Sequence, residues 1–505
     1  MSDTFSNRFF SFRYRFKIHI IFCALVPLWL NSSVFFSTYA EEVKTSLSGE
    51  AKGAEGLIIR LYSYDNFIGK NDVLLTQDTI NDDGFFNIDV FLNPNSVKYT
   101  YFAINRLESY NLFLEAGNHY EIVLYPIDYN PEKIIFPLSP SEKISFGFKE
   151  FDETELNHLI WRFNAEYNFF INSNLPNLTR NINKNIFSDF KNRIDSLFAD
   201  IKNEYFNNFR TYSLAELEMS LRLKSNETLA KKYFHDVPFL YENIAFMNFF
   251  NSFYVNFIFF GSQKINFKDI ELNIEKNKNY FALLDSLGKD ELLQNEVVRE
   301  MVLIKNLMEL YYSNLKIDVK QSSIISMLEE IANKSKFEKH RSIANDIINA
   351  ITKNIPGKKA EDFILKDING NDIRFSDYRG KYLYVMFFTT WCTPCLSEFT
   401  VMENLYKEYS DSISFLSVSM DTEARKFYYF TNNYSFSWDF VHFGNNFELE
   451  KYYNVKVYPL AILIDPNGNI VTNTAKLPTE DLTRVLYNMF RKEKDAELKY
   501  EIWRD

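Results

Sequence analysis

Cysteine is scarce in this sequence. Only three cysteines occur among the 505 residues, and they are Cys23, Cys392 and Cys395. A secreted scaffold held together by several disulfides is therefore excluded. The six histidines are scattered, and neither a second pair of cysteines nor paired histidines could complete a tetrahedral zinc site with Cys392 and Cys395. We therefore predict no bound metal.

Glycine, proline and clustered positive charge are also lacking. The 14 glycines and 13 prolines make up less than half of the usual combined share of about 12%, which excludes collagen-like and low-complexity chains. The net charge is −11 and no basic run is long enough to follow a phosphate backbone, so we predict no nucleic-acid partner. The 51 Phe and 32 Tyr are interpreted as core-filling residues. Hydrophobic residues make up 46% and charged residues 24%, as in globular proteins, and this length corresponds to about three domains.

The first forty residues have the pattern of a secretory signal peptide. Basic residues between Arg8 and Lys17 precede an apolar stretch, Ile18 to Leu30, and the small residue Ala40 ends a polar segment. The apolar stretch is shorter than the roughly 20 residues needed to span a bilayer, and an uncleaved anchor is the alternative. We expect residues 1–40 to direct export to the periplasm or cell envelope. A dithiol acting as a reductant there requires a membrane or envelope electron donor.

Two regions without catalytic motifs follow. From 41 to 140, short segments with period-two alternation are separated by turn residues, which predicts a small antiparallel β-sandwich. From 148 to 353 the apolar spacing becomes helical, and Phe190, Ile194 and Phe198 fall on one helical face. We therefore predict an all-α middle domain.

Strand and helix patterns alternate from 356 to 495, which predicts a C-terminal α/β domain. The segment around Asn369-Gly370 is typical of a hairpin, and residues 381–388 form a continuous apolar run suited to a central strand. A helix is predicted from Trp391 onward, and Thr479 is placed to cap a final helix.

The motif Trp391-Cys392-Thr393-Pro394-Cys395 stands where the buried strand passes into a helix. A helix N-terminus stabilises negative charge, so we expect the pKa of Cys392 to lie below the free value of about 8.5 and the thiolate to act as nucleophile. Cys395 lies one helical turn further on, within reach of a mixed disulfide at Cys392. A merely structural disulfide would close so short a loop that it would add little stability.

The C-terminal third resembles the TlpA/ResA-like thiol-disulfide oxidoreductases of the thioredoxin superfamily, in multidomain exported bacterial forms of the AhpC/TSA/Redoxin type. The resemblance is carried by "LKDINGNDIRFSDYRGKYLYVMFF", "WCTPC" and "YYNVKVYPLAILIDPNGNI". It implies a thioredoxin-like fold, a redox-active Cys392–Cys395 disulfide and no other cofactor.

The same resemblance assigns further residues. It implies a cis peptide bond before Pro459, opposite the dithiol, which exposes the neighbouring backbone for pairing with the substrate. It also implies that Trp391 and Tyr458 border the substrate groove. Glu398 matches a glutamate that exchanges a proton with the resolving thiol, and the alternative is a solvent-facing residue at the helix start. Met386 stands where thioredoxin has a buried aspartate, so a proton relay would run elsewhere.

We expect an exported enzyme that reduces or isomerises the disulfides of protein substrates, because Thr393-Pro394 lacks the histidine of strongly oxidising relatives. One alternative is a thiol peroxidase, although Val385 stands where a peroxidase motif has proline and only Thr389 matches it. The other is a non-catalytic binding or scaffold protein, since the regions before residue 356 carry no catalytic signature.

Overall fold

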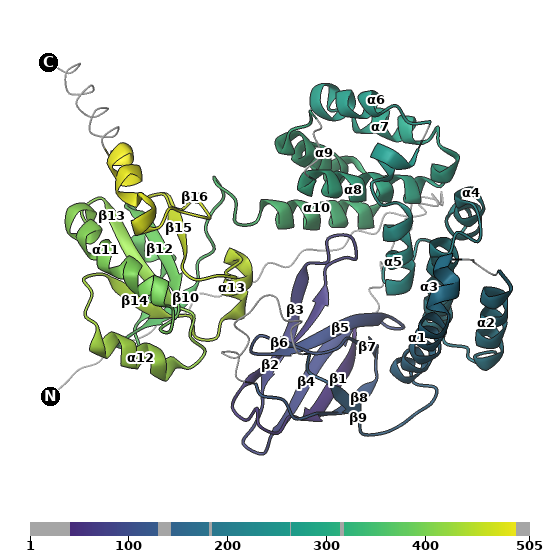
Figure 1. The fold of residues 1–505 in the computed structure, drawn as a ribbon, viewed down its shortest axis with the longest axis horizontal. Coiled ribbons are helices and arrows are strands. Elements are labelled where there is room, and N and C mark those ends of the chain that lie inside the picture. The colour runs from purple at the N-terminus through teal and green to yellow at the C-terminus, as the bar shows by residue number, and fades with distance from the viewer. Residues whose placement is uncertain (1–40, 130–142, 181–183, 263, 314–317, 491–505) are drawn as a thin grey trace, which may run out of the picture. The chain divides into compact units, whose positions relative to one another are not determined.

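The computed structural model describes residues 41–129, 143–180, 184–262, 264–313 and 318–490 (Figure 1). The predicted signal peptide, residues 1–40, lies outside the described residues, as do residues 491–495 at the end of the predicted C-terminal domain. Within the described ranges, none of the helices is both long enough and apolar enough to cross a membrane.

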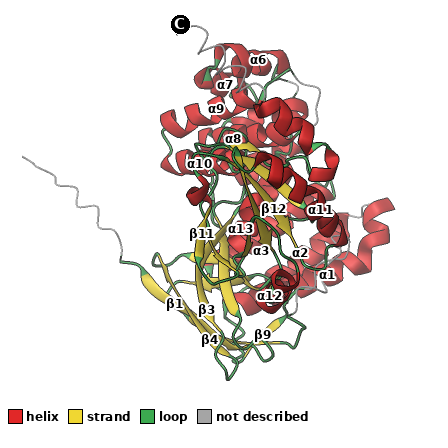
Figure 2. Cartoon of the chain, turned by 90° about the vertical axis from the view of Figure 1, so that its left-hand side faces the viewer, coloured by secondary structure: helices red, strands yellow, loops and turns green. Residues whose placement is uncertain are grey.

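An N-terminal β-domain, residues 43–148, contains two sheets. One has the strand order β4-β1-β8-β9, and the other has the order β3-β2-β5-β6 with β7 paired to β5. Buried apolar residues from both sheets, including Leu47, Leu61 and Ile122, form one core. The strands, yellow in Figure 2, are β1 (Val43–Glu50), β2 (Ile58–Tyr64), β3 (Asp72–Thr79), β4 (Phe85–Leu92), β5 (Val97–Ile104), β6 (Leu107–Glu108), β7 (Leu112–Glu115), β8 (His119–Leu124) and β9 (Phe146–Phe148).

Two details correct the predicted antiparallel sandwich of residues 41–140. Strand β1 is antiparallel to β4 but parallel to β8, with Leu47 opposite Tyr120. A short turn makes neighbouring strands antiparallel, but strands β2 to β7 separate β1 from β8 in the sequence, so that rule does not apply to them. Strand β9 pairs with β8 beyond the predicted boundary at 140. Its three residues are too few to show a period-two pattern.

The middle of the chain is a helical domain, as predicted. Many of its helices begin at asparagine, whose side chain accepts a backbone N–H of the first turn, as Asn203, Asn243 and Asn295 do. Besides short 3₁₀ and π turns, the helices are α1 (Leu156–Arg180), α2 (Lys184–Leu197), α3 (Glu204–Ser220), α4 (Asn226–Ala230), α5 (Ile244–Phe253), α6 (Phe267–Leu272), α7 (Tyr280–Leu287), α8 (Glu296–Tyr312), α9 (Gln321–Lys334) and α10 (Glu338–Thr352).

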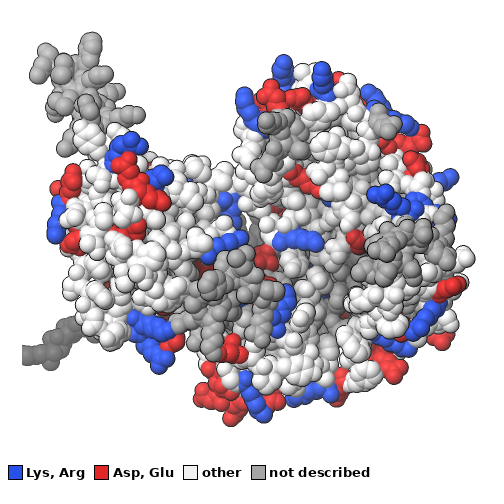
Figure 3. Space-filling model, viewed as in Figure 1, with Lys and Arg blue, Asp and Glu red and all other residues white. Residues whose placement is uncertain are grey.

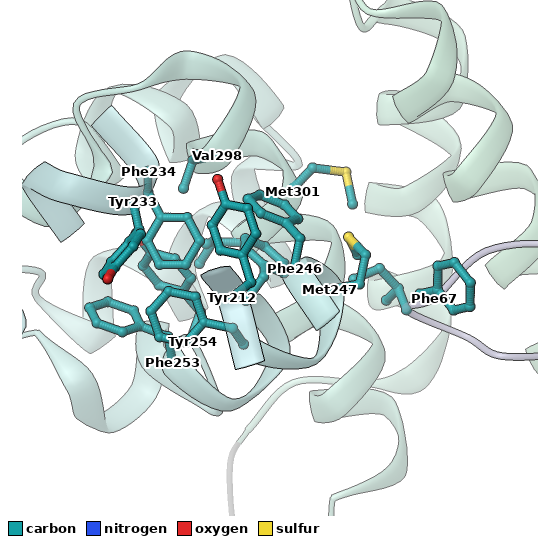
Figure 4. Close-up of a cluster of buried hydrophobic side chains, with 14 of the residues drawn as sticks. Phe67, Tyr212, Tyr233, Phe234, Phe246, Met247, Phe253, Tyr254, Val298 and Met301 are labelled. Atoms are coloured by element: carbon teal, nitrogen blue, oxygen red, sulfur yellow. The ribbon is translucent and has the colours of Figure 1, made fainter. Parts of the chain in front are cut away.

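Aromatic rings fill the centre of the helical domain (Figure 4). The ring centroid of Phe234 lies 5.0 Å from that of Phe249 and 5.2 Å from that of Tyr254. Phe67, from the loop between β2 and β3, belongs to the same buried cluster, and Figure 4 shows it beside Met247 of α5. The β-domain and the helical domain therefore share apolar packing.

The C-terminal domain, residues 356–490, has a mixed sheet with the strand order β11-β10-β14-β13-β12-β15-β16. The central strand β12 is parallel to β13 and antiparallel to β15. This domain contains β10 (Ile364–Asp367), β11 (Asp372–Arg374), β12 (Tyr382–Phe388), α11 (Thr393–Tyr409), β13 (Ile413–Ser419), α12 (Ala424–Asn433), β14 (Asp439–His442), α13 (Phe447–Tyr453), β15 (Leu460–Ile464), β16 (Ile470–Thr472) and a helix at 482–490.

Alternating side chains of β12 point to opposite faces of this sheet. Met386 and Phe388 pack with residues of α11, α12 and the helix at 482–490, whereas Val385 and Phe387 pack with residues of α13. Helices thus cover both faces, which explains why β12 is apolar along its whole length. The predicted hairpin around Gly370 is confirmed as β10 and β11.

Charges of both signs are interspersed on the molecular face drawn in Figure 3. Among the described residues, surface lysines and arginines often pair with carboxylates: Lys44 lies 2.8 Å from Asp89, and Arg193 lies 2.8 Å from Glu166. On that face, the described residues form no continuous positive surface along which a phosphate backbone could lie.

Candidate active site

The site is built at the passage from β12 into α11. Strand β12 ends at Phe388, and Cys392 is the N-cap residue of α11. Its sulfur accepts a hydrogen bond from the backbone N–H of Cys395 at 3.2 Å. The helix dipole and the unpaired N–H groups of the first turn meet at this sulfur, a setting that favours the thiolate when Cys392 is reduced.

The two sulfurs are bonded to each other, so the structure contains the oxidised form of the dithiol. Cys395 is fully buried and Cys392 is 4% exposed, whereas the neighbouring Trp391 is 43% exposed. Cys395 packs into the apolar core together with Phe399. Cys395 is therefore shielded from solvent, whereas Cys392 lies next to the exposed Trp391.

Tyr458 and Pro459 lie at the same end of the sheet as the dithiol. Leu460, the first residue of β15, pairs with Phe387 of β12, so the residues just before Leu460 stand beside the turn that follows β12. The Tyr458–Pro459 peptide bond is cis. The ring of Tyr458 meets that of Trp391 edge to face, with centroids 6.1 Å apart. Burial raises the pKa of Tyr458 to about 12, so its hydroxyl is protonated at neutral pH.

Glu398 is 5% exposed and lies on the first turns of α11. The alternative of a solvent-facing residue is therefore wrong. The backbone N–H of Thr479 donates to one carboxylate oxygen at 2.9 Å, and the Thr479 hydroxyl donates to the other at 2.6 Å. Thr479 thus bonds Glu398, while the final helix that it was predicted to cap begins at residue 482. The pairing was missed because it joins residues far apart in the sequence.

Asp421 is a further site residue that the sequence analysis missed. It follows β13 and is 1% exposed. Its carboxylate accepts the backbone N–H of Thr390 at 2.9 Å, the Thr390 hydroxyl at 2.9 Å and the Ser419 hydroxyl at 2.7 Å. Asp421 therefore holds the turn that precedes Cys392. The sequence contained a signal for Asp421, because this residue follows an apolar strand. The parallel strands β12 and β13 end at the same edge of the sheet, so the residues after them lie close together.

Met386 is fully buried and packs against the helices on the α11 side of the sheet. A methionine cannot carry a proton, so the position filled by aspartate in thioredoxin is apolar here. In the part of the chain that the structure describes, no group of three or more His, Cys, Asp or Glu side chains is arranged to hold a metal ion.

Comparisons with known proteins agree on the C-terminal domain. Residues 356–473 match the AhpC/TSA family. The thiol-disulfide oxidoreductase ResA of Geobacillus kaustophilus (strain HTA426) is 34% identical over 134 residues, which cover 26% of this chain and 75% of that protein. ResA of Bacillus subtilis (strain 168) is 29% identical over 136 residues, or 27% of this chain and 75% of that protein. A solved thiol-disulfide oxidoreductase from Bacteroides fragilis NCTC 9343 is 28% identical, with 23% of this chain and 88% of that chain covered and a TM-score of 0.22.

Proposed function

The chain belongs, through its C-terminal domain, to the ResA-like thiol-disulfide oxidoreductases, and from this premise we propose that it is an exported enzyme that reduces or isomerises protein disulfides through Cys392 and Cys395. The observation that carries the proposal is the position of Cys392. Its sulfur stands at the start of α11, bonded to Cys395 and within hydrogen-bond distance of the Cys395 N–H. Residue types, spacing and helix position all suit disulfide exchange.

The reaction begins with the reduced dithiol. The Cys392 thiolate attacks one sulfur of a substrate disulfide, which forms a mixed disulfide and releases the other substrate sulfur as a thiolate. The Cys395 thiol then loses its proton and attacks the Cys392 sulfur. The second substrate thiolate leaves, and the Cys392–Cys395 disulfide remains. In isomerisation, a thiol of the substrate itself attacks the mixed disulfide and Cys392 is regenerated.

Neighbouring residues serve these two steps. Trp391, Tyr458 and Pro459 form the border of the groove that receives the substrate polypeptide, in keeping with their common position at one end of the sheet. Glu398 accepts the proton of Cys395 during resolution, and its burial on the same helix supports this role. Thr393-Pro394 between the cysteines favours reduction or isomerisation over oxidation.

Export and electron supply complete the proposal. The basic, apolar and small residues of segment 1–40 support export to the periplasm or cell envelope. Each reduction leaves the Cys392–Cys395 disulfide, so two electrons must come from a membrane or envelope donor for the next cycle.

Insulin reduction by the purified full chain, with dithiothreitol as the electron source, tests the activity. We expect wild-type protein to accelerate precipitation of the insulin B chain and Cys392→Ser to abolish the acceleration. Cys23→Ser is the matched control, because it removes the one cysteine outside the motif. Equal rates for wild type and Cys392→Ser would refute the proposal.

Trapping and peroxide assays separate the alternatives. Cys395→Ser should accumulate disulfide-linked adducts through Cys392, because the resolving thiol is absent. Noncovalent partners without adducts would favour a scaffold protein. Rapid, saturable peroxide consumption that depends on Cys392 would favour a thiol peroxidase.

A further inference from the structure

Arg106 of the β-domain lies against the C-terminal domain near the dithiol. It occupies the turn between β5 and β6, where Asn105 has a φ of 54°, a left-handed conformation that asparagine tolerates. The Arg106 Nε lies 2.9 and 3.0 Å from the two carboxylate oxygens of Glu450 in α13, and Nη2 lies 2.8 Å from one of them. The two side chains are 23% and 21% exposed, so this is a largely buried, forked ion pair.

The surroundings keep Arg106 charged and fixed. Its guanidinium lies 5.4 Å from the ring centroid of Phe447 and 5.7 Å from that of Phe443. Burial alone would lower the pKa of Arg106, but the hydrogen bonds and the charge of Glu450 outweigh burial and raise it. A planar cation that packs against two rings and pairs with a carboxylate has few alternative positions.

The same guanidinium reaches both loops that border the dithiol. Its Nη2 donates to the backbone carbonyl of Met420 at 3.3 Å and approaches the Tyr458 hydroxyl at 3.5 Å. Met420 precedes Asp421, which holds the turn before Cys392, and Tyr458 contacts Trp391. A residue of the β-domain thus touches two segments next to the dithiol, the one that contains Met420 and Asp421 and the one that contains Tyr458.

Contacts along α13 show that Arg106 is part of an extended interface. The Tyr62 hydroxyl donates to Glu448 at 2.9 Å. Lys451 pairs with Asp72 at 3.0 Å and lies 3.7 Å from the ring centroid of Tyr62. Arg60 donates to the carbonyl of Asn445 at 3.0 Å. These contacts would hold the Arg106 turn in place.

The geometry points to Arg106 as a positioning residue that the β-domain contributes to the polypeptide-binding groove of the oxidoreductase. It fixes the Tyr458 ring beside Trp391, so that an extended polypeptide segment around a substrate cystine meets a preformed edge. This inference rests on the proposed function. It also gives the β-domain a role in substrate binding, which its sequence did not indicate.

Steady-state insulin reduction by the full chain tests it. We expect Arg106→Ala to raise the KM for insulin about tenfold, the effect of losing one charge-assisted hydrogen bond, with kcat changed less than twofold. Arg106→Lys, which keeps the charge but not the fork, should give an intermediate KM. The matched control is Lys52→Ala on the same domain, because Lys52 is 76% exposed and pairs with the nearby Glu50 of the same domain; its KM should equal that of wild type.

A second variant keeps the inference testable if Arg106→Ala does not fold, which thermal unfolding would show. Tyr458→Phe removes one hydroxyl and should raise KM in the same way. If Arg106 acts through Tyr458, the double variant will be no worse than the worse single variant. An unchanged KM in folded Arg106→Ala, an additive double variant, or a lower KM because the β-domain covers the groove would each overturn the inference. Inactive wild-type protein would instead refute the proposed function.

Discussion

Replacing Asp421 tests whether the turn before Cys392 is held by one buried carboxylate. In Asp421→Ala, the Thr390 N–H, the Thr390 hydroxyl and the Ser419 hydroxyl lose their common acceptor. A hydrogen bond to a charged group contributes about 1.5–3 kcal/mol, and part of this sum is offset because the carboxylate no longer has to be buried. We expect the free energy of unfolding of the C-terminal domain to fall by about 3 kcal/mol.

Calorimetry of the full chain measures this effect. A loss of ~3 kcal/mol corresponds to a decrease of roughly 10 °C in the unfolding temperature of a domain of this size. The control is Asp411→Asn. Asp411 is exposed and lies just before the first residue of β13, so its replacement should shift the transition by less than about 1 °C. Insulin reduction should slow as well, because Cys392 follows a turn that is no longer fixed.

Two results would refute this reasoning about Asp421. An unfolding temperature within about 2 °C of wild type would mean that solvent replaces the carboxylate at no cost. Normal stability together with normal insulin reduction would mean that the turn is held by other contacts.

Two further predictions concern the helical domain. Phe234→Ala removes a 1% exposed ring at the centre of the aromatic cluster and should lower the free energy of unfolding by about 3–5 kcal/mol; Phe260→Ala, at a 69% exposed position, is the control in the same urea titration. Burial by itself raises the pKa of Glu300, but hydrogen bonds, the largest from His340, outweigh it and lower the pKa below its ordinary value of 4.5. A carboxyl group whose pKa is lower in the folded than in the unfolded state stabilises the folded state above pH 4.5. This stabilisation is lost as the pH falls through the pKa of the folded state. The stability difference between wild type and Glu300→Gln should therefore shrink below about pH 4.5, and a difference independent of pH would contradict this account.

Local patterns were enough to place the redox motif on the correct elements. The apolar run at 381–388 became the central strand β12, and the residues after Trp391 became α11. Proline is favoured in the first turn of a helix, and Thr393-Pro394 follows the end of β12 closely. The helix therefore begins there, with Cys392 as its N-cap residue. Hairpin chemistry likewise placed β10 and β11 around Gly370. In each case the determining interactions join residues within about one turn or one hairpin of each other.

Contacts between distant segments were decided by the tertiary structure. The parallel pairing of β1 with β8, the bonds from Thr479 to Glu398 and the approach of Arg106 to Tyr458 all join segments at least 70 residues apart. Buried polar groups need partners, but a one-dimensional pattern does not say which loop will supply them. The sequence by itself therefore determined where the two cysteines stand on their helix, because strand and helix patterns are local, whereas the fold decided which carboxylate holds the turn before Cys392 and which domain reaches Tyr458.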